Sequence, residues 1–266
     1  MSRWLGFEGK TVFVMGGTSG INLGIAEAFA ENGATLLVAS RSQDKVDAAI
    51  EKLSSHGQQA YGFSADARDI EAIESGLASQ AEHFGSIDIM IVGQAGNFPA
   101  PALGMSANAF KSVVDIDLLG TFNTVKAAHQ YLGSDNPSIT AISAPQSIVP
   151  MPMQAHVCAA KAGVDMLMKV LAMELGHQGV RCNGIIPGPI EDTEGMARLA
   201  PTEEAREACR RTVPMERLGK KQDIANCAMF LASPLAEYIN GAIIPVDGGW
   251  SAAGAAVDLE SLVGSR

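Results

Sequence analysis

The stretch Met15-Gly-Gly-Thr-Ser-Gly-Ile-Asn-Leu-Gly24 follows a short apolar run and leads directly into the helical pattern Ile25-Ala-Glu-Ala-Phe-Ala30. Glycines permit a tight turn, and the free amides at the start of a helix can hold a pyrophosphate. A glycine-rich loop alone is a weak signal, and the alternative is a plain tight turn. Its place between a strand and a helix favours a nucleotide site.

Outward from this loop, seven short apolar runs alternate with longer helical patterns. Because the runs are nearly continuous in hydrophobicity, they suit strands covered on both faces, as in parallel sheets. The pattern predicts a single α/β domain over residues 1–266, a doubly wound Rossmann-type fold with a seven-stranded parallel sheet whose ligands bind beyond the carboxyl ends of the strands. The predicted strands are 11–15, 35–39, 60–63, 87–92, 138–142, 180–186 and 242–246.

The longest interruption of this alternation begins at Pro187 and carries five arginines. We expect a substrate lid at about 189–218. Seven basic residues against four acidic ones over 198–221 suggest a locally positive lid, with a solvated helical face as the alternative.

Composition excludes several classes of partner. A formal net charge of -10 argues against a nucleic-acid surface or attraction to anionic membranes, since either needs a clustered basic face. No apolar run approaches the roughly 20 residues that span a bilayer, and the N-terminus is too short and polar for a signal peptide. The four cysteines lack the spacing of a zinc site, so we expect no metal, buried thiols and a cytoplasmic protein.

These features resemble the short-chain dehydrogenase/reductase family. The family's first turn reads Thr-Gly-x-x-x-Gly-x-Gly, and this chain has Met15, Gly16, Gly20 and Asn22 at those places. Asn22 replaces the last glycine, so either its backbone is left-handed or the turn changes shape.

The second predicted strand ends Val38-Ala-Ser-Arg-Ser42, without the acidic residue that would bind the ribose hydroxyls of NAD. Ser40 and Arg41 could meet a ribose phosphate instead, so we expect NADP, with NADPH as reductant; the alternative for Arg41 is a solvated loop residue. Gly93-Gln-Ala-Gly96 stands where the family has Asn-Asn-Ala-Gly. The resemblance implies a cofactor site of Gly16, Thr18, Ser19, Gly20, Asn22, Ser40, Arg41, Asp66, Ala67, Ala95, Gly96, Lys161, Pro187, Gly188, Ile190 and Thr193.

Ordinary alcohol and carbonyl oxidoreductases of the family place Tyr-x-x-x-Lys on one helix, with the tyrosine as general acid. Lys161 is present here, but Val157 occupies the tyrosine position and Ala144 the position of the catalytic serine. Losing a tuned phenol should cost ketone reduction roughly a hundred- to ten-thousandfold. Conjugate reduction of a thioester instead forms an enolate, which needs hydrogen-bond donors on oxygen and a proton on carbon.

One branch of the family with this arrangement is the 2,4-dienoyl-CoA reductases, particularly the peroxisomal type. The chain resembles it at Ala95-Gly-Asn-Phe98, Asn108-Ala-Phe-Lys111 and Asp115-Ile-Asp117, among other places. The resemblance implies an NADPH-dependent enzyme of fatty acid metabolism that reduces a conjugated C=C bond in an unsaturated acyl-CoA. The implied catalytic residues are Asp117, which organises the catalytic water or acid, and Lys161, which holds the cofactor ribose. The implied acyl-CoA path comprises Arg41, Arg68, Phe98, Ser106, Asn108 and Arg198.

Several alternatives stay open at this point. Asp117 could be a structural aspartate, and His156 is expected to have a packing or interface role, because helical geometry turns it about 100° from the vacant tyrosine position. The chain could be an alcohol or carbonyl oxidoreductase with a relocated proton donor, or a catalytically silent NADP-binding sensor or scaffold. The family usually forms tetramers, and the apolar segments 166–173 and 241–246 could supply such contacts. The chain ends Val263-Gly-Ser-Arg266, without the C-terminal peroxisomal address, which fits a bacterial or cytosolic relative.

Overall fold

A parallel sheet of seven strands forms the centre of the molecule, in the order β3-β2-β1-β4-β5-β6-β7. The computed structural model describes residues 6–252, apart from the side chains of residues 198 and 199. This architecture confirms the predicted fold class. The strands are β1 (Thr11–Met15), β2 (Thr35–Ser40), β3 (Ala60–Ser64), β4 (Ile89–Val92), β5 (Ser138–Ile142), β6 (Arg181–Pro187) and β7 (Ile243–Val246).

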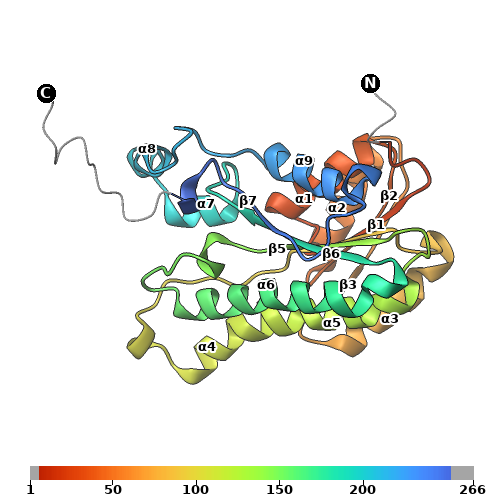
Figure 1. The fold of residues 1–266 in the computed structure, drawn as a ribbon, viewed down its shortest axis with the longest axis horizontal. Coiled ribbons are helices and arrows are strands. Elements are labelled where there is room, and N and C mark those ends of the chain that lie inside the picture. The colour runs from red at the N-terminus through yellow and green to blue at the C-terminus, as the bar shows by residue number, and fades with distance from the viewer. Residues whose placement is uncertain (1–5, 253–266) are drawn as a thin grey trace, which may run out of the picture.

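Helices cover both faces of the sheet, as Figure 1 shows. On one face lie α1 (Gly20–Glu31), α2 (Gln43–Ser54) and α9 (Lys221–Ala232). On the other lie α3 (Ile70–Phe84), α4 (Ala107–Val114), α5 (Gly120–Ala128) and α6 (Ala155–Leu175). Two short helices, α7 (Glu194–Leu199) and α8 (Glu203–Arg211), lie within the segment predicted as a lid. Among residues 6–252, none of the helices combines the length and apolarity needed to cross a bilayer.

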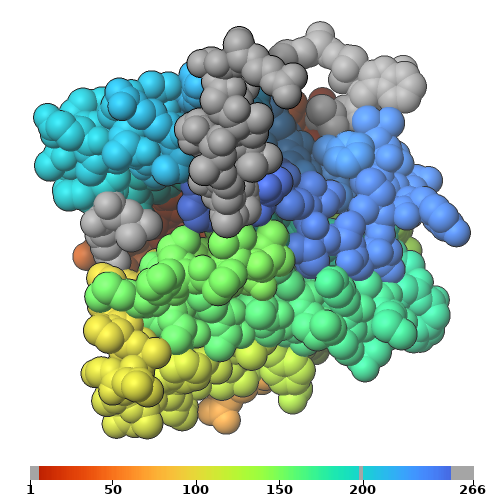
Figure 2. Space-filling view, turned by 60° about the vertical axis from the view of Figure 1, so that its left-hand side comes forward, coloured from red at the N-terminus to blue at the C-terminus, as the bar shows by residue number. Residues whose placement is uncertain are grey.

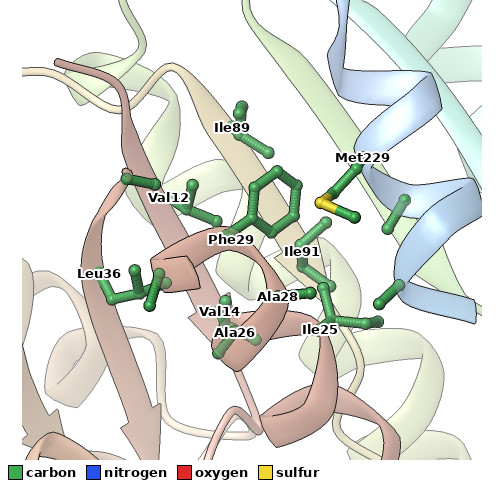
Figure 3. Packing of buried hydrophobic residues seen from close by; sticks show 14 of the residues in the cluster. Val12, Val14, Ile25, Ala26, Ala28, Phe29, Leu36, Ile89, Ile91 and Met229 are labelled. Carbon is green, nitrogen blue, oxygen red and sulfur yellow. The ribbon is translucent and has the colours of Figure 1, made fainter. Parts of the chain in front are cut away.

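Two hydrophobic cores follow from the alternation of side chains along each strand. Val12 and Val14 of β1 pack towards α1, whereas Phe13 and Met15 pack towards the opposite layer of helices. In the first core, Phe29 of α1 is fully buried among residues of β1, β4 and α9 (Figure 3). Burial on both faces explains why most positions of these strands are apolar.

The glycine-rich loop makes the turn between β1 and α1. Gly16 and Gly20 have positive φ values of 80° and 57°, a backbone conformation that glycine adopts without steric cost. Asn22 does not share it, because it lies inside α1. Of the two alternatives for Asn22, the left-handed backbone is not observed, and its side chain is accommodated within α1.

Candidate active site

Asp117 and Lys161 form a buried ion pair at the carboxyl end of the sheet. Their charged atoms, Asp117 Oδ2 and Lys161 Nζ, lie 3.4 Å apart, and the two residues are 0% and 4% exposed. Lys161 also donates to the carbonyl of Ile142, the last residue of β5, at 3.2 Å. Asp117 Oδ1 accepts the backbone N–H of Gly96, beyond β4, at 2.7 Å. The two predicted catalytic residues therefore lie together where the ends of β4 and β5 meet.

An irregular helical turn carries Asp117 into this position. Residues Asp115–Leu119 form a π-helix between α4 and α5, a feature often found at functional sites. The backbone carbonyl of Asp117 accepts the Thr121 hydroxyl at 2.6 Å, and Thr121 in turn accepts the side-chain amide of Gln94. Asp117 is thus fixed through both its backbone and its carboxylate.

No phenol lies beside this pair. Val157, which occupies the position expected for a catalytic tyrosine, is buried with Val113 and Ala160. The three tyrosines of the chain lie elsewhere: Tyr61 stacks on His83, Tyr131 packs on Phe84, and Tyr238 is fully exposed.

A chain of side-chain amides runs along the same edge of the sheet. Gln146 donates to Gln154 at 2.6 Å, and Gln154 donates to Asn97 Oδ1 at 3.1 Å. Gln154 is only 3% exposed, whereas Asn97 is exposed and directly follows Gly96, the partner of Asp117. The Nδ2 group of Asn97 has no hydrogen-bond partner within the described part of the chain, so it is free to donate to a ligand.

The predicted cofactor residues gather at the carboxyl ends of β1, β2, β3, β4 and β6. Gly20 opens α1 with free space where a Cβ would lie, which leaves the first amides of this helix accessible to a pyrophosphate. Ser40 ends β2 with its hydroxyl buried and without a partner in the described structure. These features fit a dinucleotide. Pro187 ends β6, and the remaining members lie in the loops that follow these strands: Thr18, Ser19, Ala67, Ala95, Gly188, Ile190 and Thr193.

Asp66 and Arg68, which the resemblance assigned to cofactor and substrate respectively, bind one another. Arg68 Nη2 lies 2.6 Å from Asp66 Oδ2, and the Arg68 backbone N–H donates to Asp66 Oδ1 at 2.9 Å. The Arg68 side-chain hydrogen bond holds the pKa of the Asp66 carboxyl below its usual value, with a smaller contribution from Arg41. Asp66 is therefore held in its ionised form as the counter-ion of Arg68.

Comparison with known proteins identifies the family. A family model described as enoyl-(acyl carrier protein) reductase matches residues 16–251. The peroxisomal 2,4-dienoyl-CoA reductase of Saccharomyces cerevisiae, named as (3E)-enoyl-CoA-producing, is 41% identical over 247 residues, covering 91% of this chain and 84% of that protein. The chain belongs to the short-chain dehydrogenase/reductase family.

Further relatives agree with this membership. The peroxisomal 2,4-dienoyl-CoA reductase of Rattus norvegicus is 40% identical over 244 residues, with 91% of this chain and 84% of that protein covered. The crystal structure of a dehydrogenase/reductase from Sinorhizobium meliloti 1021 superposes with a TM-score of 0.86 at 30% identity, covering 93% of this chain and 97% of the other. The resemblance stated from the sequence is confirmed.

The residues expected along the acyl-CoA path of this short-chain dehydrogenase/reductase belong to several different elements. Phe98 is beside the site, where its ring meets that of His156 with centroids 4.4 Å apart. Ser106 caps α4 by accepting the Ala109 N–H, and Asn108 is exposed in the first turn of α4. Arg198 belongs to α7, but its side chain lies outside the described residues.

In the segment of this short-chain dehydrogenase/reductase that is predicted as a lid, four arginines pair with acidic residues. Arg206 pairs with Glu203, Arg210 and Arg211 both pair with Glu207, and Arg217 pairs with Asp223. Each of these cations thus has an acidic partner nearby in the sequence. Because Arg210 and Arg211 share Glu207, the segment keeps its surplus of basic residues, and a locally positive lid stays a prediction. Figure 2 shows α7 and α8 above the segments that follow β4 and β5, which is where we expect a substrate lid.

Two cavities lie on the lid side of this short-chain dehydrogenase/reductase, of about 380 and 840 Å³. The smaller includes Gly188 and Ile190 in its wall, and neither is lined by Asp117 or Lys161. Within residues 6–252, no three His, Cys, Asp or Glu residues gather as a metal site would require. The catalytic assignment therefore depends on the ion pair rather than on a cavity.

Sequence reasoning missed Asp165 and the amide chain of Gln146, Gln154 and Asn97, whereas it expected a packing role for His156. His156 is completely buried, neither ring nitrogen has a hydrogen-bond partner in the described structure, and its packing on Phe98 agrees with the expected packing role. Asp165, one turn beyond Lys161, is 6% exposed. Burial raises the pKa of the Asp165 carboxyl; the nearby Ser143 and Ser147 hydroxyls oppose this, but neither forms a well-aligned hydrogen bond with it. The four-residue spacing of Lys161 and Asp165 on one helix was the available signal.

Proposed function

We propose that this chain is an NADPH-dependent reductase of a conjugated C=C bond in an unsaturated acyl-CoA, of the 2,4-dienoyl-CoA reductase type. The observation that carries the proposal is the buried Asp117–Lys161 pair beside Val157. It retains a cationic anchor for the cofactor and lacks a phenolic acid. The 41% identity to a 2,4-dienoyl-CoA reductase supports the same substrate class.

Residues at the strand ends would hold the cofactor. The turn after β1 and the first amides of α1 would face the pyrophosphate, Ser40 and Arg41 would bind a ribose phosphate, and the segment from Pro187 to Thr193 would contact the carboxamide. When bound, NADPH supplies a hydride to the far end of the diene. Lysine has three N–H donors; Lys161 donates one to Ile142 and faces Asp117 Oδ2 as an ion pair without a hydrogen bond, so it keeps a donor for a ribose hydroxyl.

Hydride addition to the diene leaves negative charge on the thioester oxygen and on two chain carbons. The Asn97 amide is placed to donate a hydrogen bond to that oxygen, with its orientation held by Gln154. Asp117 Oδ2 has an ion pair but no hydrogen bond, so it can accept from a water molecule and orient it towards carbon. Proton transfer from water to the carbon next to the carbonyl yields a (3E)-enoyl-CoA, and the resulting hydroxide is neutralised by solvent.

A relocated phenol is not supported, because all three tyrosines lie away from the pair. The proposal also covers the cellular location and the oligomeric state. We expect a cytoplasmic enzyme, in keeping with four free cysteines, and a homotetramer associated through exposed apolar residues of α5 and α6.

The decisive experiment measures NADPH oxidation by the purified chain with 2,4-hexadienoyl-CoA and, in parallel, with a simple ketone. We expect turnover of the thioester at least about a hundredfold faster than of the ketone, since only ketone reduction needs the missing acid. Product analysis by NMR should locate the double bond between C3 and C4. Faster turnover of the ketone would overturn the proposal. Tight NADPH binding without turnover of either substrate would instead indicate a sensor or scaffold.

A further inference from the structure

The side chain of Asn22 joins the phosphate turn to the end of a neighbouring strand. Its Nδ2 group donates to the carbonyl of Gly93, just beyond β4, at 2.7 Å, and to the carbonyl of Gly16 at 3.4 Å. Asn22 is 8% exposed, and its Oδ1 has no hydrogen-bond partner in the described structure. The loops after β1 and β4 are thus bound together beneath the nucleotide site.

Gly93 provides the space for this side chain. A Cβ at Gly93 would lie 2.2 Å from Asn22 Oδ1, 2.4 Å from its Nδ2 and 2.5 Å from its Cγ. Real carbon atoms do not approach so closely, and the Asn22 amide is held in place by its bond to the Gly93 carbonyl. Gly93 has no positive φ, so its backbone does not require glycine. Glycine is needed there only because Asn22 fills the space.

The same two positions are the ones at which this chain departs from the family's motifs. Asn22 stands where the phosphate turn has glycine, and Gly93 stands where Asn-Asn-Ala-Gly begins with asparagine. The asparagine and the glycine have thus exchanged positions. Together the two positions still supply one side-chain amide and the space that it fills.

We propose that Asn22 and Gly93 are an exchanged pair, in which Asn22 acts as a positioning residue for the dinucleotide. The two loops already approach closely, since a Cβ at Gly16 would lie 3.0 Å from the Gln94 backbone nitrogen. Asn22 fixes the spacing of these loops from within α1, and so fixes the amides that face the pyrophosphate. The inference concerns cofactor binding alone and holds for any reaction of the bound NADPH.

The test is a double-mutant cycle of Asn22→Gly, Gly93→Asn and the double variant, with NADPH affinity measured by isothermal titration calorimetry. Loss of one hydrogen-bonding tie in Asn22→Gly should weaken NADPH binding about five- to tenfold. Gly93→Asn should weaken it further, because two asparagine side chains cannot share the space. The double variant should bind NADPH within about threefold of wild type, as coupled neighbours are not additive. A double variant as weak as the product of the two single losses would overturn the proposal.

Two controls keep the result interpretable. Asn226→Gly makes the same change in α9, so it reports the cost of glycine in a helix and should leave NADPH affinity unchanged. If Gly93→Asn does not fold, Gly93→Ala replaces it: alanine should weaken NADPH binding when Asn22 is present and have little effect in Asn22→Gly. An equal effect of alanine in both backgrounds would contradict the pairing. Because no acyl-CoA is needed, the result does not depend on whether the proposed reaction is correct.

Discussion

At the scale of single residues, the central feature of the site is the ion pair between Asp117 and Lys161. Lys161 and Asp117 are buried and neutralise one another, and removing one member of such a pair leaves an uncompensated charge. Informative substitutions must therefore keep the shape of the side chain.

Asp117→Asn keeps that shape while weakening the acceptor that we assign to water. We expect kcat with a 2,4-dienoyl-CoA to fall about a hundredfold or more, with NADPH affinity within about threefold of wild type. Asp115→Asn is the matched control, since Asp115 lies in the same π-helix but pairs with Lys111 at the surface. Steady-state kinetics and calorimetry check both variants. Unchanged kcat in a folded Asp117→Asn protein would give Asp117 a structural role.

Arg41 decides between the two nicotinamide cofactors in our proposal. Arg41→Ala should weaken NADPH binding about tenfold while leaving NADH binding nearly unchanged, because only NADPH has the extra phosphate. Lys45→Ala removes a cation from the adjacent α2, where it pairs with Glu194, and should change neither affinity. Equal losses for both cofactors would contradict a phosphate contact at Arg41.

At the scale of elements, the apolar runs predicted all seven strands to within two residues at each end, because burial on both faces leaves a clear signal. The π-helix had no such signal, since the sequence around Asp117 has an ordinary helical pattern. The amide chain was also hidden. Gln154 and Asn97 are 57 residues apart and meet only after the sheet orders β4 beside β5.

Within α6, Asp165 should make stability depend on pH. Its folded pKa is raised above 3.8 by burial, so between the unfolded and folded values the folded chain binds more protons and the free energy of unfolding falls as pH rises. Asp165→Asn lacks this fall, so its stability relative to wild type should increase as pH rises above about 4. Urea unfolding at a series of pH values measures the difference.

For Asp66→Asn we expect the opposite dependence of stability on pH. The Asp66 pKa is lowered by Arg68, so its stabilising contribution is present above 3.8 and is lost as pH falls towards the folded value. Asp66→Asn should thus lose stability relative to wild type as pH rises through this range. Parallel curves for the two variants would contradict both assignments.

At the scale of the whole molecule, one helical layer carries apolar side chains that stay exposed within residues 6–252. Phe122 of α5 and Met166, Val170 and Met173 of α6 are between 40% and 84% exposed. Sequence pattern marked 166–173 as apolar but could not say whether it faced the core or solvent. The fold places part of it outside, which fits contact with further copies of the chain.

Met173→Lys, alone or with Met166→Lys, should shift the assembly from tetramers towards smaller species, because charge in an apolar contact is costly. Met215→Lys in the lid segment introduces the same charge at a 61% exposed methionine and should leave the mass unchanged. Light scattering after size-exclusion chromatography gives the masses. A wild-type monomer would refute the tetramer.

The π-helix of Asp115–Leu119 has one further consequence. A π turn amounts to one extra residue within a helix, so excising Ile116 would let α4 and α5 merge into a single regular rod. Asp117 would then swing about 100° around the axis and leave Lys161 without its counter-ion. The shortened protein should keep its sheet and its nucleotide loop yet be unable to turn over. Deleting the single codon for Ile116 should therefore abolish activity, although every side chain of the site is still encoded.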